Sequence, residues 1–404
     1  MIDRPLYMKK IEPFLNSPFV KIITGIRRSG KSTILEAVKE RLIEKGVAPE
    51  RIIYAKLDSY AFEHITTGSQ LYHAMCEKMQ DGETNYLLLD EVQEVEDWEK
   101  AVNGLHEDKR ANIFITGSNS KLMSSEIATY LSGRYVIIPL YTLSFQEYID
   151  FRRAIGDIKE TKAYLESYVR FGGFPAVSKG NYEQNEAYTV VRDIYNSVIY
   201  NDIVKRNKIR KVDQFECLVK FMFENVGKTF SAQSVSDYMK SEKRTLDIET
   251  IYNYVKLLQK AYILYEAERY NIQGKEVMKT QEKYYLADPS LKYAVLGYYD
   301  TSVAAMLENI VYLEMVRRGY ESYVGYSIGK EIDFVGVLRD EKVYIQVTRQ
   351  MPDHEKGRER EIGNLEKIKD HYPKYVVTLD EYAGGNENGI KIVHLADFLL
   401  QERW

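Results

Sequence analysis

The sequence predicts an α/β protein whose first 140 residues form a parallel sheet with helices on both faces. Strand-like apolar segments alternate with helix-like segments from residue 19 to about residue 140. A glycine-rich loop joins the first of these strands, residues 19–24, to a helix that begins near Thr33. Later in this region, two acidic residues end an apolar strand at residues 85–89. These three observations together favour a parallel sheet that holds a ligand at the carboxyl ends of its strands.

The glycine-rich loop has the sequence Gly-Ile-Arg-Arg-Ser-Gly-Lys-Ser at residues 25–32, which is the spacing of a phosphate-binding loop (P-loop). Glycines let the backbone N–H groups approach a polyphosphate, which also faces the amino end of the following helix. Lys31 can reach the β and γ phosphates, and the Ser32 hydroxyl can ligate Mg²⁺. We predict that ATP and Mg²⁺ bind here, with nucleotide contacts from Gly25, Ile26, Arg27, Arg28, Ser29, Gly30, Lys31, Ser32 and Thr33.

The acidic pair Asp90-Glu91 follows the buried strand that lies about 60 residues after the loop. Adjacent side chains leave a strand end in different directions, so the two acids can take different roles. We expect Asp90 to hold Mg²⁺ and Glu91 to polarise the attacking water. This pairing favours hydrolysis over nucleotide binding alone.

Two further positions are candidates for contact with the γ phosphate. Ser118 and Asn119 follow the strand at residues 111–116, where they can orient the water or contact the phosphate, or simply cap the next helix. Arg134 stands at a helix-to-strand junction, where it can stabilise the transferred phosphoryl group of a neighbouring subunit or be an ordinary surface arginine.

The composition is that of an ordinary globular protein of two or three domains, with 404 residues, 45% hydrophobic and 29% charged. The net charge of −4 means that any nucleic-acid contact must come from a local basic patch. The two cysteines, Cys76 and Cys217, show no metal-ligand spacing. Apolar runs are too short to cross a bilayer, and we expect a cytoplasmic protein without membrane contact.

Five motifs occur in order, and their order resembles a prokaryotic group of AAA ATPases: Gly-Ile-Arg-Arg-Ser-Gly-Lys-Ser, Leu-Leu-Leu-Asp-Glu-Val-Gln, Ile-Thr-Gly-Ser-Asn-Ser, Leu-Ser-Gly-Arg and Gly-Gly-Phe-Pro. The resemblance implies ATP as the nucleotide and Ser118 or Asn119 as the sensor of the γ phosphate. It also implies that Arg134 is the arginine finger, which would make the active protein a homo-oligomer. No lid arginine matches the family's second sensor.

The segments after the predicted ATPase core, 1–140, divide into three predicted domains. Residues 141–200 are mostly helical and form a predicted lid, interrupted by residues 171–175, Phe-Gly-Gly-Phe-Pro. Residues 201–285 have the order helix, turn, helix and hairpin of a winged helix: a helix at 231–239, a second at 248–261 and then a strand at 262–267. Residues 201–245 carry ten basic and six acidic side chains.

The second helix of the winged helix is the candidate DNA-reading helix. It carries Thr250, Asn253, Tyr254, Lys256 and Gln259. Because this helix is only mildly basic, DNA contact and a protein-packing role both stay open.

The last predicted domain, residues 286–404, resembles the restriction-endonuclease-like (PD-D/E-x-K) nucleases. In that fold an acid on one strand and an acid two residues before a lysine on the next strand bind Mg²⁺. Here Gln346 stands at the second acid and Thr348 at the lysine, and the remaining acids are Glu308, Glu331 and Asp333. The substitutions favour a fold that has lost its chemistry over an active nuclease.

The sequence therefore predicts a Mg²⁺-dependent AAA-type ATPase that couples its nucleotide state to DNA or to a DNA-associated partner. One alternative is a slow nucleotide-gated switch that binds a protein partner without acting on DNA. A weaker alternative is an active Mg²⁺-dependent nuclease.

Overall fold

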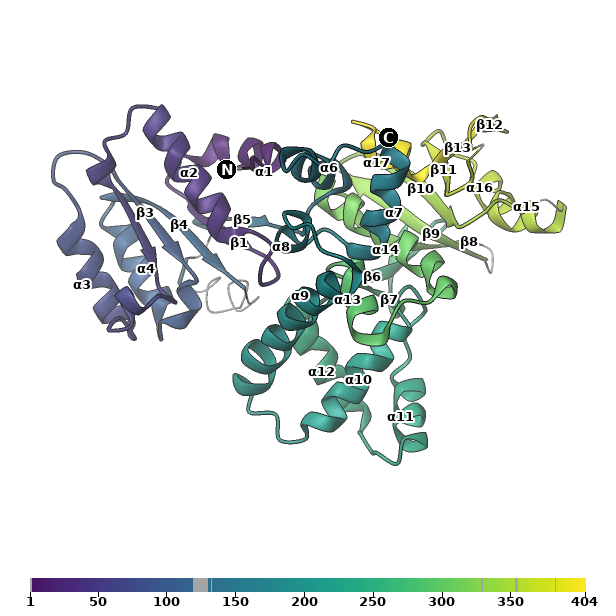
Figure 1. Ribbon diagram of the computed structural model, residues 1–404, viewed down its shortest axis with the longest axis horizontal. Helices are drawn as coiled ribbons and strands as arrows, with labels where there is room; N and C mark the ends of the chain where they lie inside the picture. Colours follow the sequence, from purple (N-terminus) through teal and green to yellow (C-terminus); the bar gives the residue numbers. More distant parts are fainter. Residues whose placement is uncertain (1, 119–129, 132, 328–329, 353–354, 382) are drawn as a thin grey trace. The chain divides into compact units, whose positions relative to one another are not determined.

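A computed structural model describes residues 2–118, 130–131, 133–327, 330–352, 355–381 and 383–404 (Figure 1). The chain divides into two compact units. The N-terminal unit holds residues up to Tyr141 together with Lys260–Tyr262, and the C-terminal unit holds the rest.

The N-terminal unit is built on a parallel five-stranded sheet in the order β2-β3-β4-β1-β5, as the alternating pattern predicts. Its strands are β1 (Val20–Thr24), β2 (Ile52–Lys56), β3 (Asn85–Asp90), β4 (Ala111–Gly117) and β5 (Tyr135–Pro139). Because all five strands are parallel, their carboxyl ends lie along one edge of the sheet. The P-loop follows β1 at that edge, and the acids end β3 there.

Helices cover both faces of this sheet and create two separate cores. On one face Leu88 of β3 packs with α1 (Pro5–Ile11) and α2 (Lys31–Glu44). On the other face Leu87 and Leu89 pack with α3 (Gly68–Lys78) and α4 (Trp98–Glu107). Strand alternation explains the split, because successive side chains of β3 point to opposite faces.

Three prolines in residues 1–18 predict an irregular segment before β1, but its described part forms α1 and the 3-10 turn Glu12–Phe14. Pro5 occupies the first turn of α1, where a missing N–H costs nothing and the fixed φ suits a helix. Tyr7 and Ile11 then bury the inner side of α1 in the core.

The C-terminal unit begins with helices. They are α6 (Phe145–Ala154), α7 (Thr161–Phe171), α8 (Pro175–Ser178), α9 (Gln184–Asn196), the π-helical segment Ser197–Lys205, α10 (Val212–Glu224), α11 (Ala232–Ser241) and α12 (Ile248–Lys260). The Gly-Gly turn after α7 is tied to a later segment. The Asp288 carboxylate accepts hydrogen bonds from Gly173 N at 2.7 Å and Ser290 N at 3.0 Å. A Cβ on Gly172 would lie 1.7 Å from the same carboxylate, so the turn requires glycine.

The C-terminal unit also contains an eight-stranded mixed sheet, in the order β12-β13-β11-β10-β9-β8-β6-β7. Its strands are β6 (Leu264–Asn271), β7 (Glu276–Leu286), β8 (Glu321–Ser327), β9 (Lys330–Leu338), β10 (Glu341–Thr348), β11 (Lys374–Thr378), β12 (Asn386–Glu387) and β13 (Ile390–His394). Strands β10, β11 and β13 are parallel neighbours, so they end at a common edge. The accompanying helices are α13 (Pro289–Leu296), α14 (Val303–Arg318), α15 (Glu355–Glu361), α16 (Gly363–Glu366) and α17 (Leu395–Leu400).

The hairpin β6-β7 forms one end of this sheet. Strand β6 joins it to the rest by pairing in parallel with β8, from Arg269–Val324 to Asn271–Tyr326. The expected order of two helices and a hairpin is present as α11, α12, β6 and β7. The hairpin, however, shares its sheet with the strands of residues 321–394. The division of residues 141–404 into lid, winged helix and nuclease-like domain stays a prediction. None of the described helices is long and apolar enough to span a membrane.

Lys21, the second residue of β1, is an unusual core residue. It is fully buried, its Nζ donates to the Ser17 carbonyl at 3.0 Å, and it lies 4.5 Å from the centroid of the Phe114 ring. Burial lowers the pKa of Lys21 to about 7.

Lys21→Met should therefore alter how stability depends on pH. Above pH 7 the unfolded chain holds a proton on Lys21 that the folded chain has lost, so raising the pH toward 10 stabilises the native protein. The slope approaches about 1.4 kcal/mol per pH unit. Lys21→Met should be more stable than the unsubstituted protein at pH 7, and the difference should shrink by pH 9.

Urea unfolding followed by Trp98 fluorescence in a Trp404→Phe background measures this difference for the N-terminal unit. Lys9→Met, at an exposed lysine of α1, is the matched control and should leave the pH profile unchanged. A difference between Lys21→Met and the unsubstituted protein that stays constant from pH 7 to pH 9 would contradict the explanation.

Candidate nucleotide-binding site

The P-loop requires glycine at its first position. Gly25 has a φ of 151°, and a Cβ there would lie 2.0 Å from the Leu140 carbonyl oxygen. Gly30, at the other end of the loop, has a left-handed φ of 100° and is the N-cap of α2. The backbone conformation therefore favours glycine at both positions, as the sequence predicts.

The loop and the start of α2 present donors that suit a polyphosphate. Gly30 has no side chain to cap α2, so no capping side chain occupies the first-turn N–H groups. The buried Ser29 hydroxyl has no hydrogen-bond partner among the described residues. Unpaired donors at a helix N-terminus are the chemistry that binds phosphate, so the residues present fit a nucleoside triphosphate.

Lys31 joins the loop to the acid pair. Its side chain is 3% exposed, and Nζ donates to the carbonyls of Gly25 and Ile26, each at 3.2 Å. The same Nζ lies 3.6 Å from the Glu91 carboxylate. The structure thus brings together two residues that are 60 positions apart, as the sequence analysis expects of a phosphate lysine and a catalytic acid.

Asp90 is fully buried at the end of β3. Thr116 Oγ1 donates to Asp90 Oδ1 at 2.5 Å, and the Tyr54 hydroxyl donates to Oδ2 at 3.1 Å. These bonds fix the direction of a carboxylate at the same sheet edge as Ser32, which lies in the first turn of α2. A carboxylate and a hydroxyl are hard oxygen ligands, so the pair fits Mg²⁺.

Glu91 has a left-handed backbone, with φ 54° and ψ 48°, which is uncommon for a residue with a side chain. Its N–H donates to Thr116 Oγ1 at 2.9 Å, and Gln93 Nε2 donates to its carboxylate. Burial alone would raise the pKa of Glu91, but the nearby Lys31 ammonium and the Gln93 bond hold the pKa below its usual value. The carboxylate is therefore ionised at neutral pH, as a water-orienting group requires.

The remaining predicted site residues fall in different places. Ser118 is buried just beyond β4, and its Oγ lies 3.5 Å from Gln93 Nε2. Asn119 lies outside the described residues. Arg134 precedes β5 and is 51% exposed, 3.5 Å from Glu107. Its carbonyl accepts a bond from Val20 N at the amino end of β1, so Arg134 lies at the sheet edge opposite the P-loop.

Four residues that support the site were not predicted from the sequence. Thr116 and Tyr54 orient Asp90, and Gln93 orients Glu91. Arg4 donates to the Ser29 carbonyl of the loop at 2.9 Å and to the Tyr141 carbonyl at 3.1 Å. Of these four residues, Gln93 is the one whose place in the sequence suggests a role, since it stands two positions after Glu91. The others are placed by strand register and by the packing of α1.

The acids of the predicted nuclease-like region lie around a lysine. Lys283 of β7 is buried, and its Nζ lies 2.6 Å from the Glu331 carboxylate and 3.8 Å from that of Glu308. Burial, and then the charge of Asp333, raise the pKa of Glu308 well above its usual value. Burial also raises the pKa of Asp333, to about 6.

Gln346 and Thr348 occupy the positions that the sequence analysis assigned to an acid and a lysine. The Gln346 amide accepts from Asp333 N at 3.4 Å and donates to Glu361 at 3.3 Å, and Thr348 Oγ1 donates to the Gln350 carbonyl. Within the described part of the chain, no group of three histidine, cysteine, aspartate or glutamate side chains could hold a metal ion.

The parallel sheet, the glycine loop and the lysine–acid contact define a P-loop nucleotide-binding protein. The sequence model of an AAA domain matches residues 17–149, and that of a domain of unknown function matches residues 162–302. An uncharacterized protein of Haemophilus influenzae is 35% identical over 402 residues, 99% of each chain. The chain therefore belongs to the AAA-type P-loop ATPases, in a family that it shares with the Haemophilus protein.

One further relative in sequence and one solved structure are also similar to this chain. An uncharacterized protein of Methanocaldococcus jannaschii is 29% identical over 368 residues, which cover 87% of this chain and 79% of that protein. The solved structure of the Walker-type ATPase of Pyrococcus abyssi is similar with a TM-score of 0.52 and 14% identity, over 73% of this chain and 96% of that chain. At this identity the likeness concerns the fold alone.

Proposed function

We propose that this protein binds ATP with Mg²⁺ on residues 25–33, hydrolyses it, and couples the nucleotide state to DNA or to a DNA-associated partner through its C-terminal half. The observation that carries the ATPase proposal is the contact between Lys31 and Glu91 beside the glycine loop. A phosphate-binding cation and an ionised carboxylate at one sheet edge are the two groups that phosphoryl transfer to water needs.

In this proposal Lys31 binds the β and γ phosphates, and the loop N–H groups hold the triphosphate in place. Mg²⁺, held by Ser32 and Asp90, would neutralise phosphate charge. Glu91 orients a water and accepts its proton as the water oxygen bonds to the γ phosphorus. The bond from that phosphorus to the bridging oxygen breaks, leaving ADP and phosphate. Ser118 is proposed to contact the γ phosphate, as is Asn119.

Two substitutions separate binding from hydrolysis. Lys31→Ala should abolish ATP binding, because it removes the ammonium group that is proposed to bind the β and γ phosphates directly. Glu91→Gln should bind ATP within a few-fold of the unsubstituted protein but hydrolyse it roughly 10²–10⁴-fold more slowly, because the amide cannot accept the proton.

Calorimetric titration with ATP and a phosphate-release assay measure the two effects. Glu96→Gln, at an exposed glutamate just beyond the acid pair, is the control and should change neither. The proposal is wrong if Lys31→Ala retains full affinity, or if Glu91→Gln retains full turnover.

Arg134 is proposed to act on the nucleotide of a neighbouring subunit. Its place at the amino end of β5 supports this role, because five strand residues of about 3.3 Å each separate it from the P-loop edge of its own sheet. An arginine that reaches a γ phosphate from there must reach that of another copy, so the proposed active form is a homo-oligomer.

The Arg134 proposal predicts that the turnover per subunit rises with protein concentration. Arg134→Ala should lose that rise and fall at least 10³-fold at high concentration. Arg110→Ala, at another partly exposed arginine of the N-terminal unit, should behave as the unsubstituted protein does. A flat turnover from nanomolar to micromolar protein would argue against a shared site.

DNA is the proposed partner of the C-terminal half, and the basic segment 201–245 supports it. Exposed basic side chains from this segment are Lys205, Lys208, Arg210, Lys211, Lys220, Lys228, Lys240 and Lys243. On α12, Ile251 and Val255 face the core while Asn253 and Lys256 are exposed.

The other three candidate reading residues of α12 have partners within the chain. Thr250 bonds to Asp247, Gln259 bonds to Glu266, and Tyr254 packs edge-on against Phe215. Asn253 and Lys256 are therefore the proposed DNA contacts of this helix.

If DNA is the partner, duplex DNA should bind with an affinity that falls steeply with salt and should raise ATP turnover. Lys211→Gln and Lys256→Gln should each lower the slope of log K against log salt by about one. Lys9→Gln, at an exposed lysine of the N-terminal unit, is the control. DNA-independent turnover with a stable ATP complex would favour the slow switch that binds a protein. Mg²⁺-dependent cleavage lost in Asp333→Ala would favour the nuclease.

A further inference from the structure

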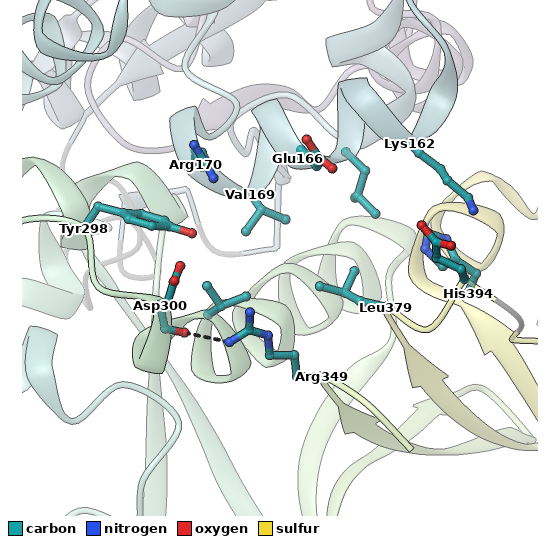
Figure 2. A pocket seen from close by; sticks show the side chains of 12 residues that line it. Lys162, Glu166, Val169, Arg170, Tyr298, Asp300, Arg349, Leu379 and His394 are labelled. Carbon is teal, nitrogen blue, oxygen red and sulfur yellow. Dashed lines mark hydrogen bonds between the residues drawn. The ribbon is translucent and has the colours of Figure 1, made fainter. Parts of the chain in front are cut away.

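A pocket of about 260 Å³ lies within the C-terminal unit, where α7 faces the common edge of β10, β11 and β13 (Figure 2). Arg349 directly follows β10, Leu379 directly follows β11, and His394 is the last residue of β13. In α/β sheets, the crevice outside the carboxyl ends of parallel strands is where ligands bind. None of the acids around Lys283 lines this pocket, so it is separate from the nuclease-like cluster.

The floor of the pocket is apolar and its ends are polar. Leu165 and Val169 of α7, Val303 of α14 and Leu379 supply the apolar surface. Figure 2 shows Lys162 and His394 at one end and Arg170 and Tyr298 at the other, with Val169 and Leu379 between them. A ligand that fits must therefore carry an apolar body between polar groups.

Two guanidinium groups at the rim of the pocket are suited to an anion. Arg170 and Arg349 come from different elements, and both are exposed at the rim. Arg349 Nη1 donates to the Asp300 carbonyl at 3.2 Å, and the Arg170 guanidinium lies 5.0 Å from the centroid of the Tyr298 ring. Each guanidinium has five N–H donors, so both keep donors for a planar carboxylate.

The buried ring of His394 supplies a donor at the opposite end. Its Nδ1 accepts the N–H of Ala396 at 3.2 Å and caps α17, so in the neutral ring Nε2 carries the proton. Burial lowers the pKa of His394 and keeps the ring neutral at pH 7. Nε2–H is then available to an acceptor on the ligand.

Charge and size limit the ligand further. Three acids also line the pocket, Glu166, Asp300 and Glu381, and they balance Lys162, Arg170 and Arg349. Because these six charges sum to zero, the rim does not attract a multiply charged ligand, and the preference for a single carboxylate comes from the two guanidinium groups. Since a 150 Å³ cavity holds one benzene, a pocket of 260 Å³ holds roughly ten non-hydrogen atoms.

We propose that this pocket binds a small organic monocarboxylate with an apolar body, its carboxylate on Arg170 and Arg349 and its body on Leu165, Val169, Val303 and Leu379. The inference does not rest on the proposed ATPase, since every residue that it uses belongs to the C-terminal unit.

Phenylacetate and phenylacetamide are matched probes, because they have the same shape and size and differ in charge. Titration of the full chain should give phenylacetate a dissociation constant below about one millimolar and phenylacetamide one at least tenfold weaker. Arg170→Gln and Arg349→Gln should each weaken phenylacetate binding about tenfold while leaving phenylacetamide unchanged.

Arg153→Gln, at an exposed arginine of α6, removes the same charge away from the pocket and is the control. Unchanged thermal unfolding would show that the variants fold. The proposal is overturned if both probes bind equally, if neither binds at millimolar concentration, or if all three arginine variants bind phenylacetate alike.

Discussion

The buried ammonium group of Lys31 is the constraint on which the nucleotide site depends. A fully desolvated cation is costly unless hydrogen-bond acceptors and an opposite charge surround it. Two loop carbonyls and the Glu91 carboxylate provide both. The same contacts hold the loop, the start of α2 and the end of β3 in one arrangement. In the proposed reaction, the cation and the base are therefore already in place at the sheet edge, where developing charge can be stabilised without reorganisation.

Parallel strands explain why the candidate site of each unit lies at an edge of its sheet. In the N-terminal sheet, the ends of β1, β3 and β4 bring the loop, the acid pair and Ser118 together, although the chain separates them by up to 93 residues. In the C-terminal sheet, the ends of β10, β11 and β13 bring Arg349, Leu379 and His394 to one pocket. Side chains that end or follow a strand are not held in the sheet's pattern of alternating packing, so they can carry chemistry.

Local patterns predicted much of the nucleotide site, and non-local pairing decided the rest. The glycine loop, Lys31 and the acid pair are readable because each sits in a short segment with its own spacing. Thr116 reaches Asp90 only because β3 and β4 pair with Leu89 opposite Ile115. That contact cannot be predicted from residue 116 alone. The pairing of β6 with β8 is another contact that the local order of elements does not predict, since it joins residues more than 50 positions apart.

The charges of the acidic cluster in the C-terminal sheet argue against nuclease activity. A divalent metal held here, where no nucleotide phosphate would share the coordination, would need several carboxylates turned toward one point. Here the Lys283 ammonium lies among the acids and pairs with Glu331, while the second-acid position holds the neutral amide of Gln346. The Asp333 carboxylate accepts the Val347 N–H at 2.8 Å, which ties it to β10. A lysine that pairs with Glu331 weakens the attraction of these acids for a metal, which supports a structural role for this cluster.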